Sequence, residues 1–135
     1  MVMQYADLEI SIHRQNDDTY SVDFRLSRPD SDETRTDRAE LKQASLKADD
    51  LLDSLYEPQE YSQKLTSGFF TDQALKNFFS SYKSSVLSQA EMGIRLRFFI
   101  GSDAPELHRI HWELLLDPDT KAPIASGQNI LFSRY

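Results

Sequence analysis

The chain lacks cysteine and has little glycine or proline. None of its 135 residues is cysteine, and only four are glycine and five proline. The absence of cysteine excludes disulfides, thiolate zinc sites and a cysteine nucleophile, and it suits a reducing cytosol. Few glycines and prolines argue against a low-complexity or linker-dominated chain. We therefore expect a cytoplasmic protein with a single domain over residues 1–135.

Long apolar runs are also missing, and positive charge is in deficit. No run approaches the about 20 apolar residues that cross a bilayer, and the N-terminus lacks the basic and apolar regions of a signal peptide. The formal net charge is −7 and the pI about 4.9. A field of that sign repels phosphate backbones. We expect neither a membrane nor a nucleic acid as partner.

The first part of the chain alternates apolar and polar residues. This period-two pattern covers residues 8–13 and 20–26, with the polar turn former RQNDDT between them. It predicts a β-hairpin over residues 5–27 with one apolar face, ended by Pro29. Residues 28–47 are polar and mixed in charge. We expect them to form a long exposed connection, with partial order against the hairpin as the alternative.

Residues 48–91 carry helical spacing. The first predicted helix has one apolar side, formed by Leu51, Leu52, Leu55 and Tyr56. Pro58 fits the first turn of a second helix, and Thr71 or Asp72 can cap a third, which Gly93 would end. The second and third helices bear stripes at spacings of three and four: Tyr61, Leu65, Phe69, then Leu75, Phe78, Phe79, Tyr82 and Val86. Aromatic residues at this spacing indicate core rather than a ligand pocket.

The last part of the chain predicts strands around one short helix. Residues 94–100 alternate strongly, and Phe99 on the second face favours a central strand covered on both sides. Ser102 or Asp103 can cap a short helix through residues 111–116. The turn DPDTKAP and two short strands with a turn at residues 126–127 complete the chain. The predicted fold class is α/β (α+β), a mixed sheet of the hairpin, the central strand and the C-terminal strands, packed by about three helices.

The stretch ELHRIHWELLLDPDT, residues 106–120, is the one candidate for chemistry. His108, His111 and Glu113 suggest a metal-dependent hydrolase. Zinc needs three or four such ligands, and on a helix Glu113 points away from His111, two residues before it. No Gly-x-Ser-x-Gly turn or phosphate-binding glycine loop accompanies them. The metal site is therefore the less favoured alternative, and we expect no cofactor.

The same stretch also has a structural interpretation. Trp112 with Leu115 and Leu116 gives one apolar face, and a tryptophan buries about 200 Å². Trp112 is thus predicted to anchor a short helix in the core. Glu113 would point outward, where arginines could meet it: Arg95, Arg97 or Arg134.

At this point the sequence resembles a known family. LHRIHWELLLDPDTKAPIASGQNILFSRY is similar to the opening segment of CHAT domains, the caspase-like regions of large bacterial proteins, in which Trp-Glu-Leu-Leu precedes an Asp-Pro turn and a strand ending near Ser-Arg-Tyr. His111 stands where proline is usual. RLRFFIGSDAPEL and YADLEISIHR…YSVDFRLS also resemble the region leading into such domains. The family's peptidase residues, a histidine and a cysteine, lie downstream of this segment, so no catalytic residue is carried over.

The resemblance implies a non-catalytic structural, regulatory or protein-interaction module beside a caspase-like domain, rather than an enzyme. Its expected partner is the downstream caspase-like domain or another protein chain. Because the last strand runs to Tyr135, its open edge also suggests a homodimer or a self-associating scaffold. The predicted structural and interaction residues are Trp112, Glu113, Arg95, Arg97, Arg134 and Tyr135.

Overall fold

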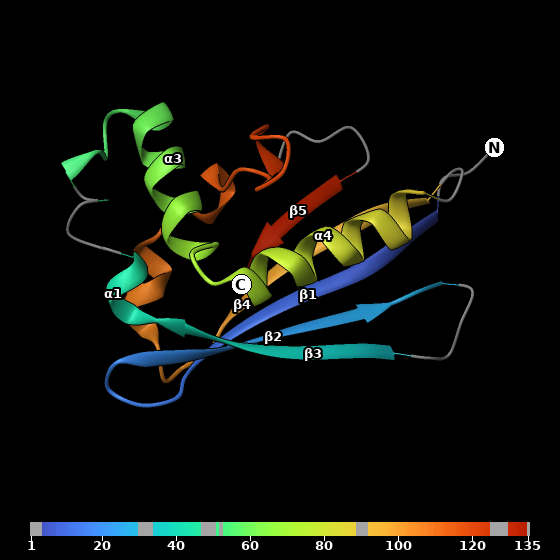
Figure 1. Cartoon of the computed structure of the whole chain (residues 1–135), viewed down its shortest axis with the longest axis horizontal. Coiled ribbons are helices and arrows are strands. Elements are labelled where there is room, and N and C mark those ends of the chain that lie inside the picture. Colours follow the sequence, from blue (N-terminus) through green and yellow to red (C-terminus); the bar gives the residue numbers. More distant parts are fainter. Residues whose placement is uncertain are drawn as a thin grey trace.

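A computed structural model describes residues 4–29, 34–46, 51, 53–88, 92–124 and 130–134, with the side chains of residues 131, 133 and 134 excepted. The strands are β1 (Gln4–Arg14), β2 (Thr19–Ser27), β3 (Thr34–Lys42), β4 (Met92–Ile100) and β5 (Ile130–Arg134) (Figure 1). The helices are α1 (Gln43–Leu46), α3 (Pro58–Phe69) and α4 (Gln73–Leu87), with two 3-10 helices, η1 (Pro105–Arg109) and η2 (Trp112–Leu114). None of the described helices is both long and apolar enough to cross a membrane.

The five strands form one mixed sheet in the order β3-β2-β1-β4-β5. β1, β2 and β3 form an antiparallel meander, whereas β4 runs parallel to both of its neighbours, β1 and β5. The parallel pairs need crossover connections, which the helical segments supply. In register, Ile10 lies between Phe24 of β2 and Phe98 of β4. The predicted α/β class, with a mixed sheet built on the N-terminal hairpin, is confirmed.

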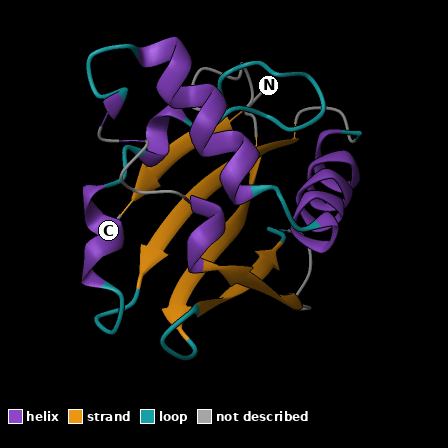
Figure 2. Cartoon of the chain, turned by 60° about the vertical axis from the view of Figure 1, so that its left-hand side comes forward, coloured by secondary structure: helices purple, strands orange, loops and turns teal. Residues whose placement is uncertain are grey.

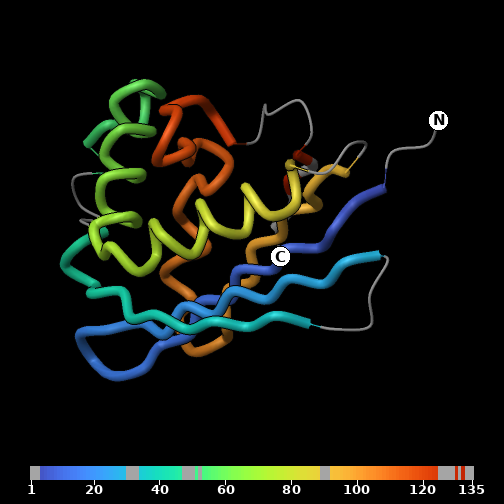
Figure 3. Tube along the Cα trace, turned by 45° about the vertical axis from the view of Figure 1, so that its right-hand side comes forward, coloured from blue at the N-terminus to red at the C-terminus, as the bar shows by residue number. Residues whose placement is uncertain are grey.

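One face of the sheet is apolar, and α3 and α4 lie over it (Figures 2 and 3). The ring of Phe24 lies 5.8 Å from that of Phe78 and 5.9 Å from that of Tyr82, both on α4. On the same face, the ring of Phe98 lies 6.1 Å from that of Phe69 on α3. The alternation in the strands therefore produced a two-layer sandwich, with the core between the sheet and the helices.

The opposite face of the sheet is polar. Cross-strand ion pairs cover it: Arg95 Nη1 lies 3.3 Å from Asp7 Oδ1, and Arg38 Nε lies 2.6 Å from Asp23 Oδ1. No described element packs on this face. The prediction that β4 is covered on both sides is therefore wrong within the described part of the chain. Phe99 is half-buried and lies 5.9 Å, ring to ring, from His13 of the neighbouring strand.

The described part of the polar connection over residues 28–47 is ordered against the hairpin: it holds β3, which pairs with β2, and α1. The expectation of partial order therefore holds, but the sequence did not predict a strand or a helix there. Its strand signal was weak because β3 is an edge strand, where polar side chains are common. Even its covered face is partly polar: the hydroxyl of Tyr82 on α4 donates to Asp37, and Arg35 lies 4.5 Å from the Tyr82 ring centre. Burial, together with the hydrogen bond to Asp37, raises the pKa of Tyr82 above its ordinary value.

The predictions of the second and third helices hold except at their ends, whereas most of the first predicted helix lies outside the described residues. Pro58 begins α3, and the Asp72 carboxylate accepts the Ala74 N–H at 2.7 Å as the N-cap of α4. Leu55 and Tyr56 do not extend an apolar side, because they lie in a turn and are 39% and 93% exposed. Gly93 does not end a helix; it lies inside β4. The predicted turn at residues 126–127 lies outside the described residues.

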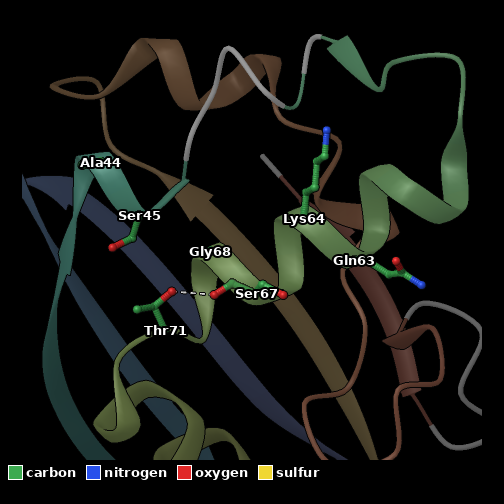
Figure 4. A pocket seen from close by; sticks show the side chains of 7 residues that line it. All are labelled: Ala44, Ser45, Gln63, Lys64, Ser67, Gly68 and Thr71. Atoms are coloured by element: carbon green, nitrogen blue, oxygen red, sulfur yellow. Dashed lines mark hydrogen bonds between the residues drawn. The ribbon is translucent and has the colours of Figure 1, made fainter.

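Gly68 lets α1 approach α3 closely (Figure 4). A Cβ atom built on Gly68 would lie 2.4 Å from the carbonyl oxygen of Ser45 and 3.2 Å from the Cα of Leu46. Both contacts are backbone, so relief requires moving α1. Packing therefore requires glycine at this position, although glycine has a low helix propensity.

We expect Gly68→Ala to lower the free energy of unfolding by about 1–2 kcal/mol, because overpacking outweighs the about 1 kcal/mol gain in helix propensity. Urea denaturation followed by circular dichroism measures the change. Ser67→Ala is the matched control, since Ser67 is exposed on the same helix and should be neutral or slightly stabilising. A Gly68→Ala variant more stable than the parent would show that α1 does not hold this position.

Candidate functional site

The segment that carries the Trp-Glu-Leu-Leu motif is not an α-helix. It forms η1 and η2, separated by Ile110, which is extended, and His111. The predicted cap at Ser102 or Asp103 is wrong: Ala104 precedes η1, with no side-chain cap. The Asp103 carboxylate instead lies 3.8 Å from His13 Nδ1. Pro105 at the first helical position favours a turn start, but the two turns are too short to propagate α-helix.

Trp112 fills the space between the sheet and α3. Its side chain is fully buried, stacked on Phe98 at 5.1 Å and 17° and edge-on to Phe69 at 5.6 Å. The indole Nε1–H donates to the carbonyl oxygen of Leu107 at 3.0 Å, so the one polar atom of the ring is paired. The prediction that Trp112 is buried in the core is confirmed.

The backbone on either side of Trp112 is hydrogen-bonded to α3. The His111 N–H donates to the Tyr61 hydroxyl at 2.9 Å, and the Leu116 N–H donates to Thr66 Oγ1 at 2.9 Å. An irregular segment leaves backbone N–H groups without the acceptors that a sheet or helix would provide. The hydroxyl oxygens of Tyr61 and Thr66 are the acceptors here. The sequence showed Tyr61 only as part of an apolar stripe, so this second role of its hydroxyl was not predicted.

Asp117 of the Asp-Pro turn is tied to α4. Its Oδ2 lies 2.5 Å from Lys83 Nζ, and its Oδ1 accepts the N–H groups of Asp119 at 2.8 Å and Thr120 at 3.2 Å. Partial burial raises the pKa of Asp117, but the hydrogen bonds from Lys83, Asp119 and Thr120 outweigh burial and hold that pKa below its ordinary value. Ser80 on the same helix donates to Asp119 at 2.5 Å. Sequence alone indicated the turn and missed its partner Lys83.

The predicted metal ligands are only partly brought together. His111 Nδ1 lies 3.6 Å from Glu113 Oε1, with both side chains about half exposed. The prediction that Glu113 points away from His111 is therefore wrong, because it assumed an α-helix. His108 lies on η1 and is exposed. Across the described residues, no three histidine, cysteine, aspartate or glutamate side chains are placed to share a metal ion.

Two of the three predicted arginine partners of Glu113, Arg95 and Arg97, lie on β4. Arg95 pairs with Asp7 on the polar face of the sheet, opposite the face on which Phe98 meets Trp112. Arg97 alternates onto the same polar face as Arg95. Pairing of Arg95 with Glu113 is therefore wrong. The backbone of Arg134 lies in register with Phe98, but its side chain, and all of Tyr135, lie outside the described residues.

A second polar cluster closes the end of the sheet where β1 and β4 stop. Arg14 pairs with Glu106 of η1, the Tyr20 hydroxyl donates to Glu106 Oε1 at 2.8 Å, and Arg14 Nε donates to the Asp103 carbonyl at 3.2 Å. Burial raises the pKa of Tyr20, and the nearby Arg14 charge opposes that shift. These contacts fasten η1 to β1 and β2. No signal in the sequence links Arg14 to Glu106, because the contact spans most of the chain.

The hollow between α1 and α3 holds about 570 Å³ (Figure 4). Its lining is mostly hydroxyl and amide side chains, and Thr71 donates to the Ser67 carbonyl at 2.5 Å. The charged side chain in the lining, Lys64, is engaged with Glu60 at 3.1 Å and Ser54 at 2.8 Å.

The described geometry therefore gives residues 105–120 a fastening role, joining the sheet, α3 and α4. Comparisons of the chain with protein-family models, with curated proteins and with solved structures find no match.

Proposed function

We propose that the chain is a non-catalytic structural and interaction module, associated with a caspase-like domain of the CHAT type. The observation that carries the proposal is the use of the motif residues in packing. Trp112 is buried against Phe98 and Phe69, and Asp117 is paired with Lys83. Groups engaged in this way hold a scaffold together and present no reactive atom to a substrate.

The form of the sheet supports an interaction role. Helices cover most of its apolar face, and its other face bears paired charges such as Arg38 with Asp23. Further structure would therefore add most readily at a sheet edge. The proposed partner is a caspase-like domain or another protein chain, in the cytoplasm. The net charge of −7 makes nucleic acid a poor partner.

An assay of the purified chain against mixed fluorogenic peptides tests the absence of catalysis. We expect no cleavage above buffer, while emission from the single tryptophan confirms a folded state. Mixing the chain with a separately produced caspase-like domain of a CHAT protein tests the partnership by light scattering, with the expectation of a one-to-one complex.

Two results would contradict the proposal. Cleavage that copurifies with the chain and disappears in a folded His111→Ala variant would make it an enzyme. Failure to bind any caspase-like domain, with the chain folded, would remove the proposed partner class.

A metal-dependent hydrolase is the second candidate, and the approach of His111 to Glu113 at 3.6 Å favours it. Metal analysis of protein purified without chelator decides between the two. We expect no stoichiometric zinc. One zinc per chain, lost in His108→Ala and in His111→Ala while the fold persists, would favour the hydrolase.

A further inference from the structure

The two edges of the sheet differ in chemistry. β3 forms one edge and β5 the other (Figure 1). The nine residues of β3 include five charged ones: Arg35, Asp37, Arg38, Glu40 and Lys42. The five residues of β5, ILFSR, include one, Arg134. Charge on an edge strand opposes pairing with another chain, so β3 is protected and β5 is not.

The apolar layer is incomplete at the β5 edge. Apolar residues of β4 on the covered face, such as Leu96 and Phe98, are almost fully buried. Their register neighbours on β5 include Phe132, which is only half-buried, as is Ile130. The ring of Phe132 lies 5.7 Å from that of Phe98, so this exposed apolar surface is continuous with the core.

β5 is also compatible with itself. Antiparallel pairing of two copies about Phe132 would place residue 131 opposite residue 133, and Ile130 opposite Arg134, with no like charges facing each other. The same operation on β3 about Arg38 would set two arginines against each other. Like charges directly opposite are destabilising in an antiparallel pair.

We infer that β5 is the docking edge of this module and that a second copy of the chain occupies it, by antiparallel β5–β5 pairing about a two-fold axis. The inference rests on the proposed interaction function and names its surface. The two sheets then join into one, and Ile130 and Phe132 of both copies are covered. Because a five-residue strand gives a small interface, the dimer is weak and forms at high concentration.

Net charge fixes how salt acts on this dimer. Each copy carries −7, so two copies repel each other at long range. Salt screens that repulsion, with a screening length of about 10 Å at 0.1 M and about 3 Å at 1 M. Raising the salt concentration should therefore strengthen association. A dimer held by ion pairs would instead be weakened by salt.

Sedimentation velocity and light scattering on the full chain test the inference from 5 to 500 μM, in 50 and 500 mM NaCl. The expected mass rises from 15.6 kDa toward twice that value, at lower concentration in high salt. The test variant is Leu131→Glu with Ser133→Glu. These positions are in register with Arg95 and Arg97, so the new charges suit the chain's own β4 while opposing each other across the two-fold axis. We expect the dissociation constant to rise about tenfold.

Matched variants distinguish the effect of charge at the β5–β5 contact from the effect of the chain's net charge. Thr34→Glu with Thr36→Glu makes the same change in net charge on the exposed edge strand β3. It should leave the β5–β5 contact intact. Leu131→Glu with Ser133→Lys restores opposite charges across this contact and should recover association. Tryptophan emission confirms that each variant is folded.

A monomer at 500 μM in both salts would overturn the inference. Association that the β5 variants leave unchanged, or that the β3 variants weaken equally, would also overturn it. Because these readouts do not involve peptide cleavage or a caspase-like domain, the inference can fail while the proposed function stands.

Discussion

Trp112→Ala is expected to lower the free energy of unfolding by about 3–5 kcal/mol. The substitution removes the stacked contact with Phe98 and the edge contact with Phe69, and leaves a cavity between the sheet and α3. It also leaves the Leu107 carbonyl without its indole donor. Because small domains are stable by only about 5–15 kcal/mol, this single change threatens the fold. Urea denaturation followed by circular dichroism measures the loss.

Two further variants keep the test informative if Trp112→Ala does not fold. Trp112→Phe retains most of the ring packing but lacks the N–H, and should cost about 1–2 kcal/mol. Tyr56→Ala removes an aromatic ring that is 93% exposed and should stay within about 0.5 kcal/mol of the parent. A Trp112→Ala variant as stable as Tyr56→Ala would refute the anchor.

Asp117→Ala is expected to have the second largest effect, a loss of about 2–4 kcal/mol. It removes the nearer of the two carboxylates that pair with Lys83, leaving only Asp119 at 3.8 Å, and it leaves two turn N–H groups unpaired. The side chains of Lys83 and Asp117 are only 16% and 10% exposed, so solvent replaces the lost contact poorly. Asp117→Asn keeps the Oδ1 acceptor for the Asp119 and Thr120 N–H groups and should cost less than Asp117→Ala. Equal stability of all three proteins would show that the pair contributes nothing.

A double-mutant cycle separates the pair from the turn. Lys83→Met keeps an alkyl stem on α4 and removes the charge, and its combination with Asp117→Asn removes both charges. We expect the double variant to be more stable than the sum of the single losses predicts, because neither charge is then left without its partner. Strict additivity would mean that the two side chains do not interact in solution.

The same pair predicts a pH dependence with a definite sign. The pKa of Asp117 is lowered in the folded state, so the unfolded chain takes up the proton at higher pH than the folded chain does. Its contribution to stability is therefore fully present above the unfolded pKa, near 3.9, and is lost as pH falls through the lower folded pKa. Denaturation between pH 7 and 2 should show a shallower acid decline in Asp117→Asn. An unchanged slope would exclude Asp117 as a source of the decline.

The sequence by itself determined the elements whose signal is local. Period-two alternation gave β1, β2 and β4, helical spacing with Pro58 and Asp72 gave α3 and α4, and the apolar residue Trp112 was placed in the core. Each of these follows from the burial of apolar side chains and from nearby groups that hydrogen-bond the backbone at helix ends. The mixed α/β class follows from the order of those elements.

Only the tertiary structure decided features whose partners lie far along the chain. β3 is a strand because it pairs with β2. Its many charged residues suit an edge strand, and for that reason its sequence shows no clear strand pattern. The backbone on either side of the Trp112 turn is placed by α3, whose Tyr61 and Thr66 side chains accept the N–H groups of His111 and Leu116. Arg95 faces away from Glu113, and Lys83 meets Asp117, because sheet register and helix placement set these distances. Local propensity is a property of neighbours in sequence, whereas register, edge position and ion pairing arise only when the whole chain packs.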